Sequence, residues 1–290
     1  MSLVYLFTPG DSRIKLEKAA GSDTDVVIID LEDGVSAADK TFARQQTYAF
    51  LEEKRREASR NKPFVIRCNP ANSPHFAEDM RLVRECGVVG VMIPKCEGAE
   101  ELRAANEAAP LAELIPLIES ARGVQQMEEI GTASDRIGKV AFGAVDFALD
   151  IGAGWSESGE ERLYAMGRIV LLSRVAGLEP PIDAVFPLLD AKESFIKDAK
   201  LGKQVGFYGK MIIHPRHIEW VRDAYQIPKE ELEWCRNAVR LYESMPSGGS
   251  VKLDGKLIDM PVYVNAKRRL GALTVQQEGG TVGEVSPEGK

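Results

Sequence analysis

The sequence predicts an α/β fold: a (β/α)8 TIM barrel with a short C-terminal lid segment. Three observations predict it. Short, β-branched apolar runs alternate along the chain with amphipathic helical patterns. The runs show little polar alternation, which is typical of parallel strands buried on both faces. Several of them also end in charged or polar residues, and in such a barrel the carboxyl ends of the strands form the active-site face.

The expected strands share this short apolar character. They are Leu3–Phe7, Asp25–Leu31, Phe64–Cys68, Val88–Ile93, Glu113–Ile118, Lys139–Phe142, Ile182–Phe186 and Lys210–Ile213. The helices expected between and after them are Arg13–Ala20, Ala37–Arg56, Phe76–Cys86, Ala99–Ala108, Ala121–Ile130, Glu160–Ala176, Ala191–Gln204, His217–Tyr225 and Lys229–Tyr242. A glycine-rich dinucleotide fingerprint is absent, which disfavours an open doubly wound sheet.

The composition changes near Ser244, and this predicts the domain organisation. Residues 1–243 are expected to form the TIM-barrel catalytic domain. Residues 244–273 contain a hairpin signal at Asp254-Gly255 and then a short helix, so they are expected to form a lid or appendage. Residues 274–290 are rich in Gly and Glu and poor in large apolar residues, which predicts a disordered tail.

Composition excludes several classes of function. The chain has 290 residues, is 44% hydrophobic and carries a net charge of −7, so it can bury a sizeable core and lacks the basic balance of a nucleic-acid-binding protein. No apolar stretch is long enough to span a membrane, and the N-terminus does not resemble a secretion signal. The cysteines form no CxxC pair, which predicts reduced thiols and a cytoplasmic location; they are Cys68, Cys86, Cys96 and Cys235.

Glu119 and Asp146 follow the fifth and sixth predicted strands. Neighbouring strands lie about 4.8 Å apart, so the two carboxylates are placed to share one hard cation. Mg²⁺ suits such a site, because it binds one or two carboxylates and keeps positions for water and substrate oxygens. The alternative is that each residue only caps the helix that follows it.

Asp30, Glu32 and Asp33 form the densest acidic cluster in the chain. Three clustered carboxylates repel one another unless a cation or a basic side chain lies nearby. They are therefore candidates to hydrogen-bond the water molecules of a metal ion. The alternative is a set of solvated loop residues that cap the helix starting near Ala37.

Arg67 lies in the apolar run FVIRCN, where a guanidinium needs an acidic partner. Its forked geometry suits a carboxylate, so we expect Arg67 to bind an anionic group of a substrate, with Asn69 at the same strand end. The alternative is an internal salt bridge to the acidic cluster around Asp30. Both interpretations can hold together.

Three further features carry weaker signals. Arg13 and Lys18 lie on the helix after the turn Thr8–Asp11, where they could bind phosphate-rich groups, although such residues usually mark a solvated face. Lys95 is the one lysine at a predicted strand end, and it has neighbours that could pair with it. His214 is a single histidine at a predicted strand end, and such a histidine is more often structural than catalytic.

Taken together, the motifs TPGD, DLEDGV, RCN, PLIESARG, FGAVD and GKMIIHP resemble the citrate lyase beta-subunit-like family of the HpcH/HpaI aldolase superfamily. The resemblance covers about residues 3–268. It implies a TIM-barrel carbon–carbon lyase that depends on Mg²⁺, with Mn²⁺ as an alternative ion. Members cleave citryl, malyl, methylmalyl or citramalyl thioesters of coenzyme A, and they release an acyl-CoA and an α-keto acid.

The resemblance also implies a role for individual residues. Glu119 and Asp146 would bind the metal, and Arg67 would hold the keto-acid carboxylate. Arg13 falls where the family has a basic residue near the coenzyme. In DGKLIDMP, Asp259 would be the catalytic acid that a lid carries to a neighbouring subunit of a homotrimer or hexamer. The residues that would order the waters of the metal are Asp30, Glu32 and Asp33.

Three alternatives remain open. The first is a class II aldolase acting on free hydroxy-keto acids, although its usual metal-binding histidines find no counterpart among His75, His214 and His217. The second is a citrate lyase beta subunit that uses an acyl-carrier protein, which the full C-terminal segment disfavours. The third is a non-catalytic binding protein, which the complete set of carboxylates disfavours.

Overall fold

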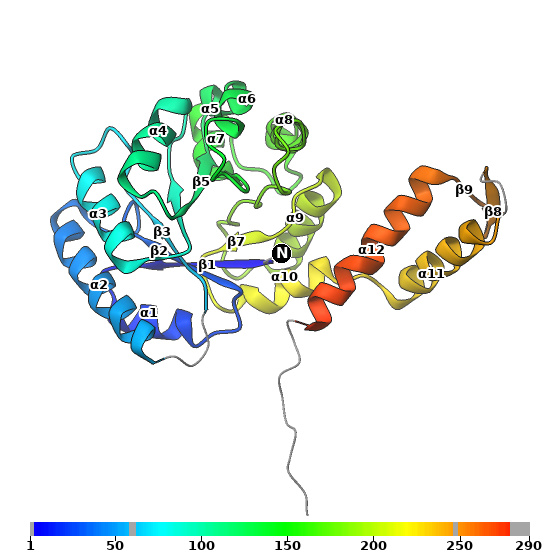
Figure 1. The fold of residues 1–290 in the computed structure, drawn as a ribbon, viewed down its shortest axis with the longest axis horizontal. Helices are drawn as coiled ribbons and strands as arrows, with labels where there is room; N and C mark the ends of the chain where they lie inside the picture. Colours follow the sequence, from blue (N-terminus) through cyan, green and yellow to red (C-terminus); the bar gives the residue numbers. More distant parts are fainter. Residues whose placement is uncertain (1–2, 58–61, 246–248, 279–290) are drawn as a thin grey trace, which may run out of the picture. The chain divides into compact units, whose positions relative to one another are not determined.

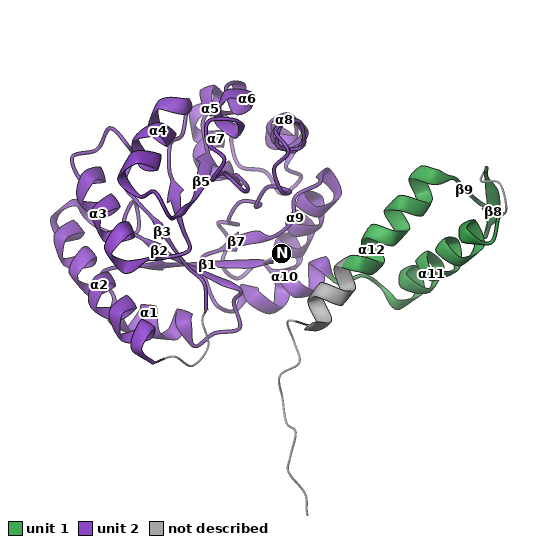
Figure 2. Ribbon diagram, viewed as in Figure 1, with its two compact units in different colours: residues 1, 226–290 green, residues 2–225 purple. Residues whose placement is uncertain are grey.

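The computed structural model describes residues 3–57, 62–245 and 249–278, with side chains described as far as residue 271. The chain divides into two compact units (Figure 2). Unit 2 spans residues 2–225, and unit 1 holds residues 226–290 together with residue 1. Each unit is described by itself below.

Unit 2 is built around a curled parallel sheet (Figure 1). Its seven strands lie in the order β6-β5-β4-β3-β2-β1-β7. The strands are Val4–Pro9 (β1), Val26–Asp30 (β2), Phe64–Arg67 (β3), Gly90–Ile93 (β4), Glu113–Ile118 (β5), Ala141–Phe142 (β6) and Lys210–Ile212 (β7). The α/β fold with a parallel sheet is therefore as the sequence predicts.

The seventh strand expected from the sequence, Ile182–Phe186, is not a strand in the structure. Only its first two residues join the sheet, through isolated parallel bridges from Ile182 to Ala141 and from Asp183 to Lys210. These bridges lie between β6 and β7, the two ends of the strand order. A buried salt bridge joins the same two segments, with Lys210 Nζ 2.6 Å from Asp183 Oδ2.

The strands are buried on both faces, as expected for strands under helices. All five residues of β2 are buried. One set of side chains fills the inside of the curled sheet: Tyr5, Val26, Ile28, Val65, Met92, Ile115, Leu117, Ala141, Ile182 and Met211. The residues that alternate with them, such as Val27 and Ile29, pack in a larger cluster that includes helix residues such as Leu16 and Phe50.

Helices follow the strands in unit 2. They are Arg13–Ala20 (α1), Ala37–Asp39 (η1), Lys40–Arg56 (α2), Phe76–Cys86 (α3), Ala99–Ala108 (α4), Ala121–Gln125 (α5), Met127–Gly131 (α6), Ala144–Asp150 (α7), Glu160–Arg162 (η2), Leu163–Val175 (α8), Lys192–Val205 (α9) and His217–Tyr225 (α10). The predicted helix Ala121–Ile130 is two short helices, and α7 was not predicted.

Unit 1 contains two helices and a hairpin. The hairpin predicted at Asp254-Gly255 is confirmed, with strands Val251–Leu253 (β8) and Lys256–Ile258 (β9). The helices are Lys229–Glu243 (α11) and Met260–Glu278 (α12). The structure thus groups α11 with the hairpin, whereas the sequence placed it in the barrel domain.

The end of α12 corrects one expectation. Residues 274–278 belong to the helix, so the tail predicted to begin at Thr274 is helical in its first part. Residues 279–290, the rest of that predicted tail, lie outside the described residues. The helix is also longer than the short helix expected from the sequence, at 19 residues.

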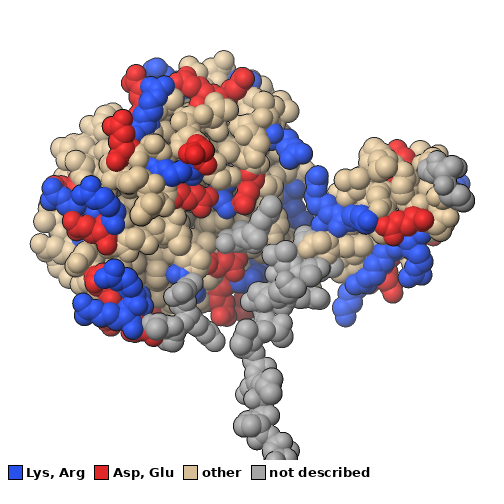
Figure 3. Space-filling view, in the orientation of Figure 1, with Lys and Arg blue, Asp and Glu red and all other residues tan. Residues whose placement is uncertain are grey.

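Other expectations from composition can be compared with the structure. No helix among the described residues is long and apolar enough to cross a membrane. All four cysteines are buried free thiols. On the face shown in Figure 3, acidic and basic side chains of unit 2 are interspersed, and no basic stripe suited to nucleic acid crosses that view.

Candidate active site

The carboxyl ends of β2, β3 and β5 bring three charged residues to one edge of the sheet. Asp30 ends β2 and pairs in register with Arg67, which ends β3. Glu119 directly follows β5. In a parallel α/β sheet this edge is where ligands bind, because the connecting loops leave an opening there.

Arg67 is almost fully engaged by acidic partners. Its Nε and Nη2 donate to the two oxygens of Asp30 at 2.8 and 2.7 Å, and its Nη1 lies 3.1 Å from Glu32 Oε2. The guanidinium also lies 4.8 Å from the centre of the Phe7 ring. Burial opposes its charge most strongly, but the hydrogen bond to Asp30 and the attraction of Asp30, Glu32 and Glu119 together outweigh burial and raise the pKa of Arg67. The internal salt bridge weighed from the sequence is therefore present.

Glu32 is a buried carboxylate with two basic neighbours. Besides Arg67, it contacts Lys95, whose Nζ lies 3.0 Å from Glu32 Oε1. Neither oxygen of Glu32 has a hydrogen-bond partner of good geometry among the described residues. Burial raises the pKa of Glu32, and attraction to Arg67 and Lys95 only partly opposes this. The carboxylate thus keeps lone pairs that a further ligand could satisfy.

Glu119 is held by the backbone on two sides. Its Oε1 accepts a hydrogen bond from the backbone N–H of Lys95 at 2.7 Å. On its other side lies Gly143, where an added Cβ atom would come within 2.5 Å of Glu119 Cβ and 2.6 Å of Oε2. Glycine is needed there because the turn after β6 passes directly against the carboxylate.

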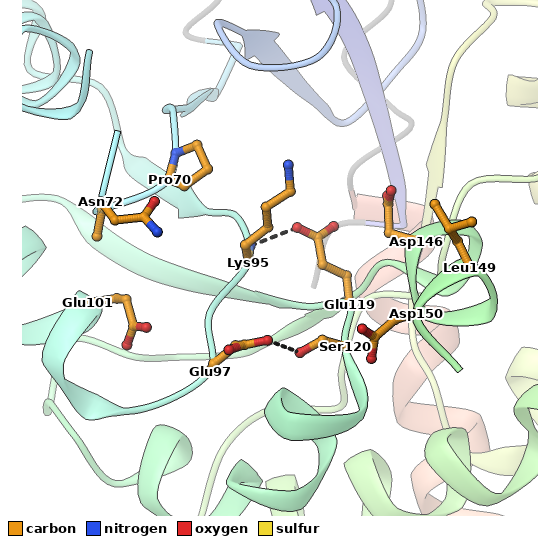
Figure 4. Close-up of a pocket in the computed structure, with 11 residues that line it drawn as sticks. Pro70, Asn72, Lys95, Glu97, Glu101, Glu119, Ser120, Asp146, Leu149 and Asp150 are labelled. Carbon is orange, nitrogen blue, oxygen red and sulfur yellow. Dashed lines mark hydrogen bonds between the residues drawn. The ribbon is translucent and has the colours of Figure 1, made fainter. Parts of the chain in front are cut away.

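Asp146 lies in the first turn of α7, half-buried and near Glu119. Burial raises the pKa of Glu119 to about 8, and repulsion from Glu32 and then from Asp146 adds to the effect. The carboxylates of Glu119 and Asp146 and the amine of Lys95 point toward the same region (Figure 4). A cation placed there would relieve this repulsion.

A cavity of about 490 Å³ opens beside these residues. Its walls come from the loops and helices that follow β3, β4, β5 and β6. They are formed by Pro70, Ala71, Asn72, Lys95, Glu97, Glu101, Glu119, Ser120, Asp146, Leu149 and Asp150. Most were not singled out from the sequence, although all follow strand ends, the one signal that could have found them. Among the described residues, no group of three His, Cys, Asp or Glu side chains could hold a metal, so a metal here would rest on two carboxylates and solvent.

Of the residues singled out from the sequence, Lys95, Glu119 and Asp146 line this cavity. Asp30, Glu32 and Arg67 are not among its lining residues, although Glu32 contacts the cavity residue Lys95.

The other candidates in unit 2 do not line the cavity either. Arg13 is paired with Glu17 and Glu53, at 2.5 Å each. Lys18 is exposed in the last turn of α1, and Asp33 is exposed next to Glu32. Asn69 is buried, and its amide nitrogen donates to Leu31 O at 2.9 Å and to Asp79 Oδ2 at 2.6 Å. Asn69 therefore holds the loop after β2 in place.

Lys40 is a buried residue that the sequence did not reveal. Its ammonium donates to the backbone carbonyls of Leu31 and Glu32, at 2.7 and 2.6 Å. It thereby fixes the loop that carries Glu32. Nothing in the local pattern distinguished it from the exposed lysines of other helices.

Asp259 begins α12 in unit 1. Its Oδ1 accepts the backbone N–H of Val262 at 3.1 Å, and its carbonyl accepts the N–H of Tyr263 at 2.9 Å. Asp259 is therefore a helix N-cap by its contacts. Leu257 and Met260, on either side of it, are exposed apolar side chains.

The raised pKa of Glu119 predicts how the stability of the folded protein depends on pH when a chelator keeps the solution free of metal ions. Between its ordinary value of 4.5 and about 8, the folded protein keeps a proton on Glu119 that the unfolded chain has released. Stability should therefore fall as pH rises through this window. The Tm of Glu119→Gln, which has no such proton, should fall less than that of the wild type between about pH 5 and about pH 8.5. Equal falls in the two proteins would contradict a raised pKa.

A comparison with protein families identifies the family of the chain. The model of the HpcH/HpaI aldolase/citrate lyase family matches residues 3–215, which include the cavity and its carboxylates. The chain belongs to this family. The family resemblance seen in the sequence motifs is thereby confirmed, and so is the enzyme class, a lyase.

Individual relatives of the family cover nearly the whole chain. The citrate lyase subunit beta of Leuconostoc mesenteroides subsp. cremoris is 31% identical over 91% of this chain and 90% of its own length. The human mitochondrial citramalyl-CoA lyase is 27% identical over 94% of this chain and 86% of its own. The structure of CitE from Mycobacterium tuberculosis in complex with magnesium, acetoacetate and coenzyme A matches with a TM-score of 0.81 and 30% identity, over 93% of this chain and 97% of that one.

Proposed function

We propose that this protein is a Mg²⁺-dependent carbon–carbon lyase. It cleaves, or forms, a 3-hydroxyacyl-CoA thioester such as malyl-, citramalyl-, methylmalyl- or citryl-CoA, and the products are an acyl-CoA and an α-keto acid. The observation that carries the proposal is the pair of carboxylates, Glu119 and Asp146, that lines a cavity beside the buried Arg67. The barrel is proposed to close as an eightfold ring, with Ile182–Asp183 in the eighth position.

The residues at this edge fit a divalent cation. Glu119 and Asp146 would bind it through oxygen, the ligand atom that Mg²⁺ prefers. Burial is the main cause of the raised pKa of Glu119, and repulsion from Glu32 and Asp146 adds to it; a bound cation would offset both effects. Glu32, with unsatisfied oxygens, would accept hydrogen bonds from its water molecules. When bound, Mg²⁺ supplies positive charge that stabilises negative charge developing on a substrate oxygen.

Arg67 supplies a second positive charge at the site. Each Nη atom of a guanidinium carries two N–H bonds, and Arg67 uses one of each for Asp30 and Glu32. The others remain for the carboxylate or the adjacent oxygen of the keto acid. Because Asp30 fixes the guanidinium from behind, its charge is oriented before the substrate binds, which is the arrangement that lowers a barrier most.

The proton is proposed to move through Asp259. As the carbon–carbon bond breaks, the 3-hydroxyl group of the substrate loses its proton to solvent and becomes the keto group of the α-keto acid. The electron pair of that bond forms an enolate on the thioester, and the enolate carbon takes a proton to give the acyl-CoA. Asp259 would donate that proton, and in the reverse direction it would remove it. The exposed apolar residues on either side of Asp259 favour docking of this segment on another surface. That surface is proposed to be a second copy of the chain, in a homotrimer or hexamer.

The replacement Arg67→Lys should lower turnover and raise the KM for the keto acid in the synthesis direction. Lysine keeps the charge but loses the two-bond fork to Asp30, at a loss of about 1.5–3 kcal/mol for a charged hydrogen bond. Steady-state kinetics and thermal unfolding would measure both effects. As a matched control, Arg222→Lys changes an arginine paired with Asp25, outside the cavity, and should leave turnover unchanged. Wild-type turnover and KM in Arg67→Lys would show that Arg67 has only a structural role.

The proposed function is tested by an activity screen of the purified protein with Mg²⁺. Malyl-, citramalyl-, methylmalyl- and citryl-CoA are each supplied, and both keto acid and free CoA thiol are measured. Keto acid released in step with loss of the substrate, without free thiol, supports the lyase. Free thiol without keto acid would identify a thioesterase instead, and neither product from any of the four would reject the proposal.

A second candidate is a citrate lyase beta subunit that acts on a thioester of an acyl-carrier protein. The observation that favours this candidate is the similarity to the Leuconostoc citrate lyase subunit beta, which covers 91% of this chain. Because the subunit matches nearly the whole chain, the presence of a C-terminal segment does not distinguish a stand-alone lyase from a citrate lyase subunit. The same screen with citryl-acyl-carrier protein distinguishes them. Cleavage of citryl-acyl-carrier protein without cleavage of any CoA thioester would favour the citrate lyase beta subunit.

A further inference from the structure

Lys95 adopts a backbone conformation that a lysine rarely takes. Its φ angle is 51°, in the left-handed region that favours glycine. Among the described residues other than glycine, it shares a positive φ only with Asp254, which lies in the turn of the β8–β9 hairpin. A glycine would fold more easily at position 95. Strained residues of this kind are concentrated at functional sites, so the lysine side chain itself needs an explanation.

The conformation of Lys95 joins two carboxylates from different parts of the chain. The backbone N–H of Lys95 donates to Glu119 Oε1 at 2.7 Å. Its ammonium lies 3.0 Å from Glu32 Oε1. One oxygen of Glu119 is thus occupied, which leaves Oε2 for another partner. Glu32 is held from one side by Lys95 and from the other by Arg67.

The ammonium of Lys95 is not required for packing of the core. The side chain is 50% exposed, while Glu32 is 4% exposed. Lys95 is the one basic side chain among the described residues that line the cavity, where the other charged residues are carboxylates. Its charge attracts both Glu32 and Glu119, two groups that repel each other.

We propose that Lys95 is a positioning residue of the active site. Its backbone holds Glu119 in the orientation for binding Mg²⁺, and its ammonium holds Glu32 where it can order the water molecules of the ion. This inference rests on the proposed function. The two roles can be separated by mutation, because the hydrogen bond to Glu119 belongs to the backbone and the contact with Glu32 belongs to the side chain.

Three variants of Lys95 test the proposal. Lys95→Gly keeps the backbone N–H and relieves the left-handed strain, so its Tm should equal or exceed that of the wild type. Lys95→Met keeps the length of the side chain and removes its charge. Both should lose kcat by about 10- to 100-fold with little change in KM, the loss expected when a residue that orders metal-bound water is misplaced. Lys95→Arg should recover part of the lost turnover.

Calorimetry of Mg²⁺ binding supplies a readout that does not depend on turnover. Because Lys95 is proposed to hold Glu32 against the water molecules of the ion, Lys95→Gly and Lys95→Met should bind Mg²⁺ about 10- to 100-fold more weakly than the wild type. Loss of a nearby positive charge without any positioning role would instead strengthen Mg²⁺ binding. Lys200→Met, which removes an exposed lysine on α9, is the matched control and should change neither kcat nor Mg²⁺ affinity. Wild-type kcat in both Lys95→Gly and Lys95→Met would overturn the proposal.

The two proposals fail in different ways. If the wild-type chain cleaves no thioester, the proposed function fails on that result alone. The role of Lys95 is then decided by calorimetry, where unchanged or stronger Mg²⁺ binding in Lys95→Gly and Lys95→Met would overturn it.

Discussion

Glu119→Gln should abolish detectable Mg²⁺ binding and lower lyase turnover by roughly 100- to 1,000-fold, because a bound metal supplies several kcal/mol of transition-state stabilisation. Glutamine has nearly the shape of glutamate, so it still fits against Gly143. Its carbonyl oxygen can still accept the N–H of Lys95, as Oε1 of Glu119 does at 2.7 Å. The variant therefore loses the charge and keeps the local fold.

Calorimetry with Mg²⁺, steady-state kinetics and circular dichroism would measure these effects. Asp146→Asn should act in the same direction, because it removes the other proposed ligand of the same ion. Glu219→Gln, on the exposed surface of α10, is a matched control that should bind Mg²⁺ and turn over normally. Wild-type Mg²⁺ affinity in both Glu119→Gln and Asp146→Asn would rule out the shared site.

Asp259→Asn should lower turnover by about 10²- to 10⁴-fold, the usual contribution of a general acid or base. Mg²⁺ binding should be unaffected, because its proposed ligands lie in unit 2. Asparagine caps a helix as well as aspartate does, so the hydrogen bond to Val262 N and the start of α12 should survive the change. Asp254→Asn makes the same chemical change in the turn of the β8–β9 hairpin and serves as a control that should keep normal turnover. Normal turnover in Asp259→Asn would show that another group moves the proton.

Mixing two inactive chains tests whether Asp259 acts on a neighbouring subunit. A Glu119→Gln chain has an intact Asp259, and an Asp259→Asn chain has an intact metal site. If the residue acts in trans, hetero-oligomers of the two should regain part of the wild-type turnover, because some sites combine two intact halves. Hetero-oligomers that form but stay inactive would place Asp259 in its own chain's site.

The sequence predicts most strands well because each is a continuous apolar run. The limits of β5, Glu113–Ile118, agree with the prediction, since a strand buried on both faces needs apolar side chains throughout. Two elements were misjudged. Residues Ala144–Asp150 are apolar and follow a strand, yet they form α7, which is too short to show a helical period. Ile182–Phe186 looks like a strand, but only two of its residues join the sheet.

The sequence drew attention to several charged residues at strand ends but did not show how they are connected. Charged residues that interrupt or end apolar runs drew attention to Asp30, Arg67 and Glu119. The sequence left open whether Arg67 faces a substrate or the acidic cluster. The structure shows the contacts with Asp30 and Glu32, which join residues at the ends of different strands. Such pairings depend on strand register, which no local pattern encodes.

By itself, the sequence determined which apolar runs form most of the buried strands and which charges stand at their ends, because a strand buried on both faces leaves a local pattern of apolar side chains. Only the tertiary structure decided that the backbone of Lys95 binds Glu119, that Gly143 is pressed against the same carboxylate, and that Lys40 supports the loop of Glu32. The contacts of Glu119 with Lys95 and Gly143 join residues 24 positions apart, and the contact of Lys40 with Glu32 spans eight positions, from a helix back to the preceding loop. They exist because the parallel sheet delivers its carboxyl ends to one edge, where a few ångströms decide which charges meet.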